Sequence, residues 1–332
     1  MTKSMAYTLA GFAGVPRLLQ RIFVRDGIAI LMYHAVIKEP LTVPDWCFVQ
    51  ESSFQEQMAY LKNHCHVIPL KEMPSLTKDN NGRPKVAVTF DDGFQSNYDI
   101  AWPILKALGL PATIFLATDF IGSDNTIWFC RLNAALSNTS LTTLEWDGIT
   151  YDLSTQISRA QAHAVIQERL KTHQHSQLLV KVRQLIQILG GRPDKPILPG
   201  SPYRMLGARE VREMAASGLI DFGAHTCSHA ILSGLSTSER EREITESLVA
   251  VERLIGLRCT LFAFPNGRVS DFGSCDVEVL EQNKITVAVT TVGGPNDRAA
   301  SVLEMRRYGI GADTSMALFK LLTHHALWIL RK

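Results

Sequence analysis

The sequence lacks the features that mark several large classes of protein. It has no run of about 18 apolar residues, so a membrane-spanning helix is not expected. It has no basic tract, and 34 lysines and arginines against 32 aspartates and glutamates leave a net charge of +2. Nucleic acid is therefore not an expected partner. The 332 residues, 46% of them hydrophobic, are enough to bury a large core.

Paired cysteines are missing as well. The six cysteines include no CxxC pair, and a chain of this length does not need six cysteines for stabilising disulfide bonds. We expect reduced and mostly buried thiols. The weakly apolar stretch at residues 5–15 is not followed by a convincing signal cleavage site. These observations favour a cytoplasmic protein, and the periplasm stays open as the alternative.

The two ends of the chain are predicted to stand apart from a central domain. Residues 1–25 are expected to form an N-terminal helical segment. Residues 313–332 read as an amphipathic helix with apolar residues on one face and Lys320 and Arg331 opposite. Such a helix can touch the inner membrane face, although packing on its own domain is the more frequent reason for the pattern.

Short apolar runs alternate with helical patterns over the central residues, 26–312. Ser236 and Glu239 form a capping box at the start of one helix, and Gly256 follows its end. Because the runs are apolar throughout, they indicate parallel strands covered by helices. We expect an α/β fold, a distorted, TIM-like (β/α) barrel of about seven parallel strands. The runs cover residues 28–33, 67–70, 86–90, 112–116, 219–222, 260–264 and 286–290.

The segment at about 121–201 breaks this alternation. Residues 144–153 read as a hairpin around Asp147 and Gly148, and residues 159–189 as one or two amphipathic helices. We therefore expect an inserted helical and hairpin subdomain near the mouth of the barrel.

An acidic pair closes the run at 86–90. Asp91 and Asp92 follow it directly, and Gly93 permits a sharp turn. In parallel α/β folds, sites form at this end of the strands. Adjacent side chains on extended backbone point in opposite directions, so one carboxylate can bind a cation while the other acts as a base. By themselves these residues could equally end a strand and cap a helix.

An imidazole pair follows the run at 219–222. If the turn after this strand is helical, His225 and His229 lie on one face, within reach of a single ion. Two imidazoles and one carboxylate leave positions open for water and substrate, which is typical of a catalytic metal site. Cys227 lies between them, and its spacing should turn it away from the ion.

Together these segments resemble the polysaccharide deacetylases of the NodB-homology type, carbohydrate esterase family 4. The sequences TFDDG at 89–93 and HTCSH at 225–229 match two motifs of that family residue by residue. The sequence FAFPNG at 262–267 is similar to the third motif of the branch that includes biofilm poly-N-acetylglucosamine deacetylases. The sequence LMYHAV at 31–36 resembles the first strand of that branch. The resemblance spans about residues 28–310, with the insertion uncovered.

The resemblance implies a hydrolase of non-peptide carbon–nitrogen bonds, a metal-dependent carbohydrate N-deacetylase. Asp91 would be the base that deprotonates a metal-bound water. A backbone N–H near Pro265 and Asn266 would hold the oxyanion. Zinc suits the ligand types best, and cobalt, nickel or iron would also fit. The implied metal ligands are Asp92, His225 and His229.

The acid that protonates the leaving amine is a first departure from the family's commonest pattern. That pattern has a Leu-x-His motif near the C-terminus, and Leu322-Thr323-His324 matches the string but lies within the terminal helix pattern. We prefer His34, because the biofilm branch resembles a permuted arrangement with an N-terminal histidine. A histidine hydrogen-bonded inside the core is the plain alternative for His34.

The arginine that orients the base is a second departure. Most family members carry it two residues before the motif-three proline, where this chain has Ala263. Arg306 or Arg307 could supply the guanidinium, and Arg307 resembles the arginine of the branch's late strand. A bidentate arginine would orient Asp91 and keep it ionised. Surface exposure is the ordinary expectation for both arginines.

Other aromatic and imidazole side chains give weaker signals. Trp128 and Phe129 could stack on a sugar ring or could simply anchor a helix. Five further histidines, which belong to no motif at a strand end, are expected at the surface. These are His64, His66, His163, His173 and His175.

We therefore expect an enzyme of carbohydrate metabolism that removes N-acetyl groups from amino sugars in a poly-, oligo- or lipid-linked saccharide, such as an exopolysaccharide. An esterase acting on O-acetyl groups of a glycan is the nearest alternative, since it would use the same metal and base. A carbohydrate-binding barrel without turnover is the other alternative. Such a protein would be expected to have lost a metal ligand or the base. This chain keeps the three implied ligands, Asp92, His225 and His229, and the base, Asp91.

Overall fold

The computed structural model describes residues 27–75, 83–296 and 300–325. The predicted helical segment at 1–25 lies outside these residues, as does the part of the predicted C-terminal helix beyond residue 325. Within the described ranges, every helix is too short or too polar to cross a bilayer.

A parallel sheet of eight strands forms the centre of the molecule. All its strand pairings are parallel, as the apolar runs predicted, and β4 (His66–Val67) pairs with the start of β5. Across the sheet the other strands are β11 (Val287–Val289), β10 (Leu261–Ala263), β9 (Ile220–Ala224), β6 (Ala112–Leu116), β5 (Lys85–Phe90), β1 (Ile28–Tyr33) and β12 (Tyr308–Gly309).

The sheet curls until its two edges are joined by one segment of chain. Val289 in β11 forms a parallel bridge with Met305, whose carbonyl accepts a hydrogen bond from Thr290 N–H (2.8 Å). A few residues later, Tyr308 in β12 pairs with Leu31 in β1. This connection between the two edges gives the predicted distorted barrel.

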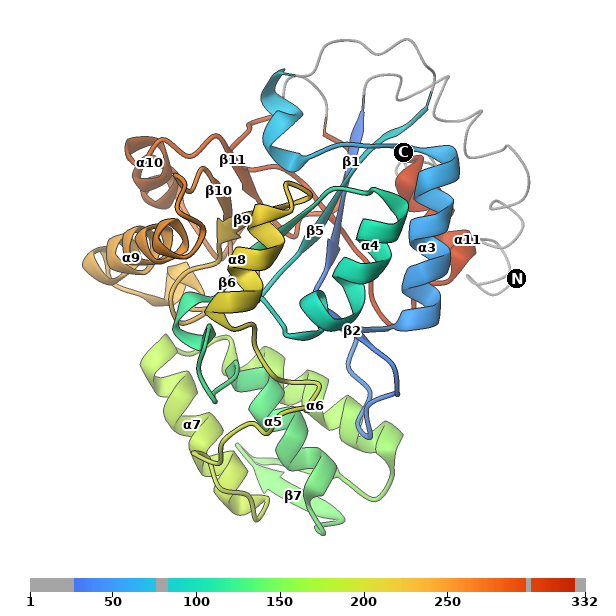
Figure 1. Cartoon of the computed structure of the whole chain (residues 1–332). Coiled ribbons are helices and arrows are strands. Elements are labelled where there is room, and N and C mark those ends of the chain that lie inside the picture. Colours follow the sequence, from blue (N-terminus) through green and yellow to red (C-terminus); the bar gives the residue numbers. More distant parts are fainter. Residues whose placement is uncertain (1–26, 76–82, 297–299, 326–332) are drawn as a thin grey trace.

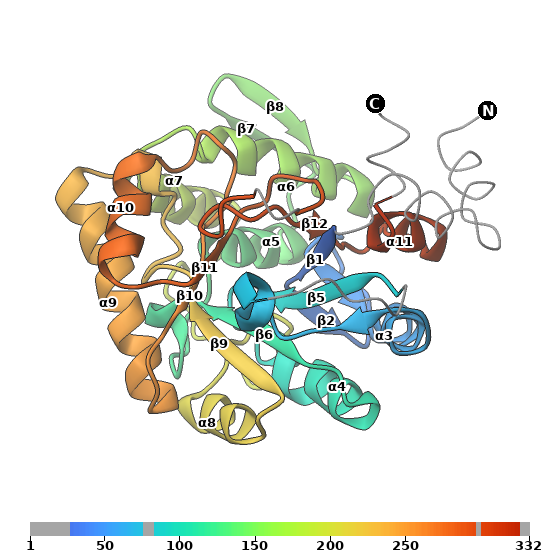
Figure 2. The ribbon, with the colours of Figure 1, turned by 90° about the horizontal axis from the view of Figure 1, so that it is seen from above.

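Helices cover the outside of the sheet (Figures 1 and 2). Helix α9 begins as predicted, with Glu239 accepting a hydrogen bond from Ser236 N–H (2.9 Å), and Gly256 ends it with φ 70°. The covering helices are α3 (Glu51–His64), α4 (Trp102–Leu108), α8 (Ala208–Ala216), α9 (Thr237–Ile255), α10 (Ser274–Gln282) and α11 (Met316–Thr323). Shorter helical turns are η1 (Leu70–Ser75), η2 (Asn97–Ala101), η3 (Thr118–Phe120) and η4 (Leu232–Gly234).

Between β6 and β9 the chain leaves the barrel and forms the predicted helical and hairpin subdomain. Asp147 and Gly148, both at positive φ, make the hairpin turn. The subdomain buries an apolar cluster that includes Leu132, Ile166 and Leu185 and that continues to Phe48 and Phe94 outside the insertion. Figure 1 shows its green elements gathered at one end of the sheet. They are α5 (Trp128–Asn138), β7 (Thr143–Trp146), β8 (Ile149–Asp152), α6 (Gln156–Leu170) and α7 (His175–Ile188).

The strand predicted at 67–70 was too long, and three short strands, β12 among them, were not among the predicted runs. The run at 67–70 forms a strand only up to Val67, because Pro69 has no N–H to donate to a ladder. The short strands β2 (Ala35–Ile37) and β3 (Phe48–Gln50) pair with each other in a separate parallel sheet. Three-residue strands give too little periodicity to be recognised in a sequence.

Candidate active site

The acidic pair stands at the carboxyl end of β5, where the backbone turns. Asp91 N–H donates to the Tyr33 carbonyl (2.9 Å), which continues the pairing of β5 with β1. Asp92 then leaves the ladder with φ 75°, followed by Gly93 with φ 86°. A Cβ on Gly93 would lie 2.7 Å from the side chain of Leu116, so this turn requires glycine. The turn sends the two carboxylates to different partners.

Asp92, His225 and His229 meet, with one ligand atom from each lying within 4.8 Å of the others. The Nε2 atoms of His229 and His225 lie 3.3 and 3.6 Å from Asp92 Oδ1. Nδ1 of His225 lies 2.7 Å from the Ala263 carbonyl oxygen and therefore carries the proton that it donates there. Burial lowers the pKa of His225 to about 4, so its Nε2 is an unprotonated ligand atom at neutral pH.

The loop that carries the two imidazoles is irregular and not helical, which corrects the predicted helical turn. Thr226 has φ 60° and His229 has φ 57°, a region that residues other than glycine seldom adopt. Cys227 faces away from the cluster, with its Sγ 3.7 Å from the Glu243 carbonyl oxygen. The imidazoles therefore converge through backbone turns and not through helical spacing.

Asp92 fits a cation better than it fits the protein groups around it. Its side chain is fully buried, and neither oxygen has a hydrogen-bond partner among the described residues. Burial raises the pKa of Asp92, but the nearby imidazoles of His229, His34 and His225 together outweigh this and lower it. A buried carboxylate that stays ionised without a donor is unfavourable. Together with two imidazoles, it forms a donor set that suits a divalent cation.

Asp91 has the opposite surroundings. Nη1 and Nη2 of Arg307 donate to its two oxygens, both at 2.7 Å. Arg307 is itself fully buried, and its Nε donates to the Thr290 carbonyl (2.8 Å). Burial raises the pKa of Asp91, but the guanidinium, together with the imidazoles of His225 and His34, outweighs it and lowers the pKa to about 2. Asp91 is therefore ionised and fixed in orientation.

The two histidines considered as the acid lie in different places. His34 lines the same cavity as Asp91, and its Nδ1 has no hydrogen-bond partner within the described ranges. Its backbone carbonyl accepts a hydrogen bond from Asn97 Nδ2 (2.8 Å). His324 is buried where α11 meets α3, with Nε2 2.9 Å from the hydroxyl of Tyr60. His324 is not among the residues that line the cavity.

The segment after β10 turns sharply at Asn266, the residue that follows Pro265. Asn266 has φ 57° and lines the cavity. Its carbonyl accepts a hydrogen bond from Thr291 Oγ1 (2.6 Å), and its Nδ2 donates to Asp271 (2.6 Å). Its backbone N–H has no acceptor in the described part of the chain. The turn is thus fixed, and one backbone donor is left unused.

A cavity of about 300 Å³ lies between the barrel and the insertion, and its lining includes His34, Asp91, His225, His229 and Asn266. Besides the strand-end residues, its walls come from the segment before β3 and from helices α5 and α6. The volume lies at the lower end of the range for small-molecule sites. The residues from these walls are Trp46, Cys47, Trp128, Phe129, Gln167, Glu168 and Lys171.

Comparison with known proteins decides the family. A family model described as polysaccharide deacetylase matches residues 78–288, more than half of the chain. The chain belongs to the polysaccharide deacetylase family. The match confirms the predicted enzyme class, a carbohydrate deacetylase that acts as a hydrolase.

Individual relatives of this deacetylase are distant or matched over a short stretch. YxkH of Bacillus subtilis (strain 168), named as a candidate polysaccharide deacetylase, is 22% identical over 296 residues, 88% of this chain and 74% of its own. A poly-beta-1,6-N-acetyl-D-glucosamine N-deacetylase of Staphylococcus epidermidis is 41% identical over 80 residues. That match covers 23% of this chain and 27% of the staphylococcal protein.

Two solved structures have the same fold as this deacetylase. The deacetylase PplD of Streptococcus pyogenes, in complex with acetate, has a TM-score of 0.58 at 18% identity and matches 90% of this chain and 98% of its own. IcaB from Ammonifex degensii has a TM-score of 0.56 at 17% identity. It matches 90% of this chain and 97% of its own.

Several cavity residues of the deacetylase were missed by sequence reasoning. Trp46 is 48% exposed, and its ring lies edge-on to that of His34 at 5.0 Å between centroids. In α6, Glu168 accepts hydrogen bonds from Lys171 (2.8 Å) and from Arg268 after β10 (2.7 Å). A lone tryptophan and a Glu–Lys pair on a helix give no functional signal in a sequence. Glu168 and Lys171 reach the site only because the insertion folds back over the barrel, whereas Trp46 comes from the segment before β3.

The weaker sequence signals had mixed outcomes. The prediction that His163 lies at the surface is wrong, because it is buried with Nε2 3.0 Å from the Phe129 carbonyl oxygen. Trp128 and Phe129 are buried and also line the cavity, and Phe129 lies edge-on to His229. All six cysteines are free, and Cys275 is the exposed one.

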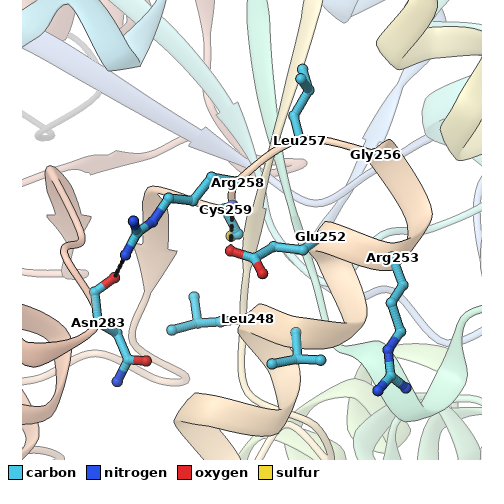
Figure 3. A pocket seen from close by; sticks show the side chains of 9 residues that line it. Leu248, Glu252, Arg253, Gly256, Leu257, Arg258, Cys259 and Asn283 are labelled. Atoms are coloured by element: carbon cyan, nitrogen blue, oxygen red, sulfur yellow. Dashed lines mark hydrogen bonds between the residues drawn. The ribbon is translucent and has the colours of Figure 1, made fainter.

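A larger hollow of about 640 Å³ lies between the end of α9 and α10 (Figure 3). There Glu252 accepts a hydrogen bond from Cys259 N–H (3.1 Å), and Arg258 donates to the Asn283 carbonyl (3.2 Å). Its described lining includes no histidine. The side chains of Glu252 and Arg258 are taken up by these bonds to the backbone, so we assign no chemistry to the hollow despite its size.

Proposed function

We propose that this enzyme hydrolyses the N-acetyl group of amino sugars in a poly-, oligo- or lipid-linked saccharide. The observation that carries the proposal is the meeting of Asp92, His225 and His229 beside the paired Asp91 and Arg307. One half of this arrangement suits a cation, and the other half offers a fixed carboxylate. Hydrolysis of an amide needs both an electrophilic centre and a base.

Asp92, His225 and His229 would hold the divalent cation. We propose zinc, and cobalt, nickel or iron also suit these donors. When bound, such a cation polarises the acyl carbonyl and makes water a better nucleophile at neutral pH. His225 needs little adjustment for this role, because its hydrogen bond to the Ala263 carbonyl already fixes the ring and its tautomer.

Asp91 would accept the proton of the attacking water. A base of this kind must be ionised and must stand within hydrogen-bond reach of that proton. The buried Arg307 supports both requirements, because it grips both oxygens and helps to lower the pKa of Asp91 to about 2. Arg307 therefore acts as the positioning residue of the base.

His34 would deliver a proton to the departing amine nitrogen. It lines the same cavity as Asp91, and its Nδ1 is not engaged by any described residue. On another wall, the unused backbone N–H of Asn266 would donate to the developing oxyanion. Pro265 would restrict the backbone just before this donor.

The cavity walls support a sugar as the substrate. Trp46 is 48% exposed and lines the cavity, and Trp128 and Phe129 line the same space. Aromatic rings offer an apolar face with a defined geometry, against which the apolar face of a sugar ring can pack. The staphylococcal relative is named for N-acetylglucosamine polymers, which supports an acetylated amino sugar.

Acetate release tests the proposal. Purified full-length enzyme is stripped with a chelator and then offered N-acetylated polymers, oligosaccharides and lipid-linked sugars, with and without added Zn²⁺. We expect zinc-dependent release from at least one N-acetylated substrate. Release from O-acetyl esters alone would indicate the esterase, and metal binding without any release would indicate a binding protein.

The His34→Ala variant tests the acid. An amine is a poor leaving group without a proton, so release from amides should fall by about 10²–10⁴-fold. Release from an O-acetyl ester should fall much less. An unchanged amide rate would contradict the role of His34, and His324→Ala serves as the matched control.

We also propose a cytoplasmic location, supported by the free thiols. The described part of the C-terminal helix uses apolar residues for packing, since Phe319 and Leu321 are buried. Contact with the inner membrane face would therefore need other residues. Cell fractionation tests the location, and recovery in the periplasmic fraction would contradict it.

A further inference from the structure

A buried carboxylate outside the cavity contacts the loop that carries the imidazole pair. Glu243 lies in α9 and is 6% exposed. Its Oε2 accepts hydrogen bonds from the backbone N–H groups of Cys227 and Ser228, both at 2.9 Å. Its Oε1 accepts a hydrogen bond from the Ser228 hydroxyl, also at 2.9 Å. One side chain thus holds the loop at its middle, between the two candidate ligands.

The loop needs such support because its backbone is strained at two places. Thr226 and His229 adopt left-handed conformations, which persist only where the surroundings fix them. The segment after β6 gives part of the support, since Thr118 and Asp119 N–H donate to the carbonyls of Thr226 (3.2 Å) and Cys227 (3.0 Å). Those bonds use the carbonyl groups of the loop, and the N–H groups are left to Glu243.

The same contact reaches the inserted subdomain. The Ser228 hydroxyl lies 3.2 Å from Nε2 of His175, the first residue of α7. Glu243, Ser228 and His175 therefore connect α9, the loop and the insertion.

We propose that Glu243 is a positioning residue for the metal-ligating pair. Its hydrogen bonds set the loop conformation that brings His225 and His229 to Asp92. This inference rests on the proposed function, because it takes the three residues to bind a divalent cation. The rival account is that the Glu243 carboxylate favours the cation only through its negative charge.

Two conservative variants separate geometry from charge. Glu243→Gln has no charge, but its amide oxygen can accept both backbone bonds and its amide nitrogen can donate to the Ser228 hydroxyl. Glu243→Asp keeps the charge, but it is one methylene shorter and cannot reach all the donors. Positioning predicts near wild-type Zn²⁺ affinity for Glu243→Gln and about 10–100-fold weaker affinity for Glu243→Asp.

The affinity is measured by competition with a chromophoric chelator, using the full-length chain stripped of metal. Circular dichroism of each metal-free variant checks that it is folded at the temperature used. Glu246→Gln is the matched control, because Glu246 lies one turn further along α9 and is exposed. This control should bind Zn²⁺ like the wild type.

Amide hydrogen exchange of Glu243→Gln gives an additional test that does not depend on Glu243→Asp folding. The amide protons of Cys227 and Ser228 should stay as protected as in the wild type. Loss of their protection without loss of Zn²⁺ affinity would overturn the proposal.

Two patterns of Zn²⁺ affinity among the Glu243 variants would also overturn the positioning proposal. Weak binding by Glu243→Gln with wild-type binding by Glu243→Asp would show that charge matters and position does not. Wild-type Zn²⁺ affinity in both variants would show that neither the charge nor the position of the Glu243 carboxylate matters for binding. A wild-type chain that binds no divalent cation would overturn the proposed function itself, and this result is distinct from either pattern among the variants.

Discussion

Two adjacent carboxylates at the end of β5 have opposite surroundings. Both are buried, but Asp91 has each oxygen bonded to Arg307, whereas neither oxygen of Asp92 has a hydrogen-bond partner among the described residues. The turn at Asp92, with φ 75°, separates them. The chain therefore completes the proton-transfer half of the site with its own groups and leaves the other half to be completed by a cation.

Removing that cation should have the largest effect. Chelation should lower acetate release by about 10³-fold or more, because several kcal/mol of transition-state stabilisation would be lost. Asp92→Asn should have the same effect. Initial rates and metal content are measured before and after Zn²⁺ is added back, which should restore the wild type but not Asp92→Asn. Full activity in chelated protein would contradict the assignment of Asp92.

The second-largest effect should be a difference in stability between variants of the two carboxylates, measured on the metal-free protein. Asp91→Asn leaves Arg307 buried without its counter-charge, so it should lower the free energy of unfolding by about 3–5 kcal/mol. Asp92→Asn removes a buried charge that has no hydrogen-bond donor among the described residues, so it should lower the free energy of unfolding clearly less than Asp91→Asn does. Urea unfolding measures both variants. Equal losses would show that the two environments do not differ as described.

The two halves also differ in how far the sequence predicts them. Asp92, His225 and His229 lie in short motifs at strand ends, and parallel strands bring such ends to one edge of the barrel. Arg307 lies 216 residues after Asp91 and reaches it only because the segment before β12 joins the two edges of the sheet. Residue types and spacing do not reveal that closure, and only the family resemblance pointed to Arg307.

Other features of the site were beyond sequence reasoning for a different reason. The left-handed conformation of Thr226 has no local signal, because a β-branched residue disfavours it. Glu243, Arg268 and Lys171 come from a helix of the barrel, a loop and the insertion, and each reads as an ordinary surface charge. Tertiary packing alone gives them their roles.

A buried imidazole outside the cavity shows another way to bury an atom without a hydrogen-bond partner, since Nδ1 of His325 lies 3.2 Å from the Tyr308 hydroxyl while Nε2 is left over. His325 Nε2 has no hydrogen-bond partner within the described ranges, and burial lowers the pKa of His325 to about 4. It can therefore stay neutral, unlike the ionised Asp92. The unfolded histidine has a pKa of about 6.5, so the unfolded chain takes up a proton as the pH falls from about 6.5 to about 4 and the folded chain does not. The free energy of unfolding should fall by about 3 kcal/mol over this range.

Urea unfolding at several pH values, with His325→Gln as the comparison, measures this loss. The variant should lose about 3 kcal/mol less than the wild type over this range, and it keeps the loss that comes from His225, whose pKa burial also lowers to about 4. It should match the wild type in zinc affinity, since His325 does not line the cavity. Parallel pH profiles of the two proteins would contradict the neutral state of His325.

Arg307→Lys should have the smallest effect, and it tests whether the two carboxylates act as separate halves. Lysine keeps the positive charge but cannot grip both oxygens of Asp91 in one plane. Loss of one charge-assisted hydrogen bond should lower the free energy of unfolding by about 1.5–3 kcal/mol. Acetate release should fall as well, because the base is no longer held in one orientation. Zinc affinity should stay unchanged, because no hydrogen bond joins Arg307 to Asp92 or to either imidazole in the described chain. If Arg307→Lys instead weakens zinc binding as strongly as Asp92→Asn, the turn after β5 does not isolate the cation site from the base, and both carboxylates belong to one electrostatic unit.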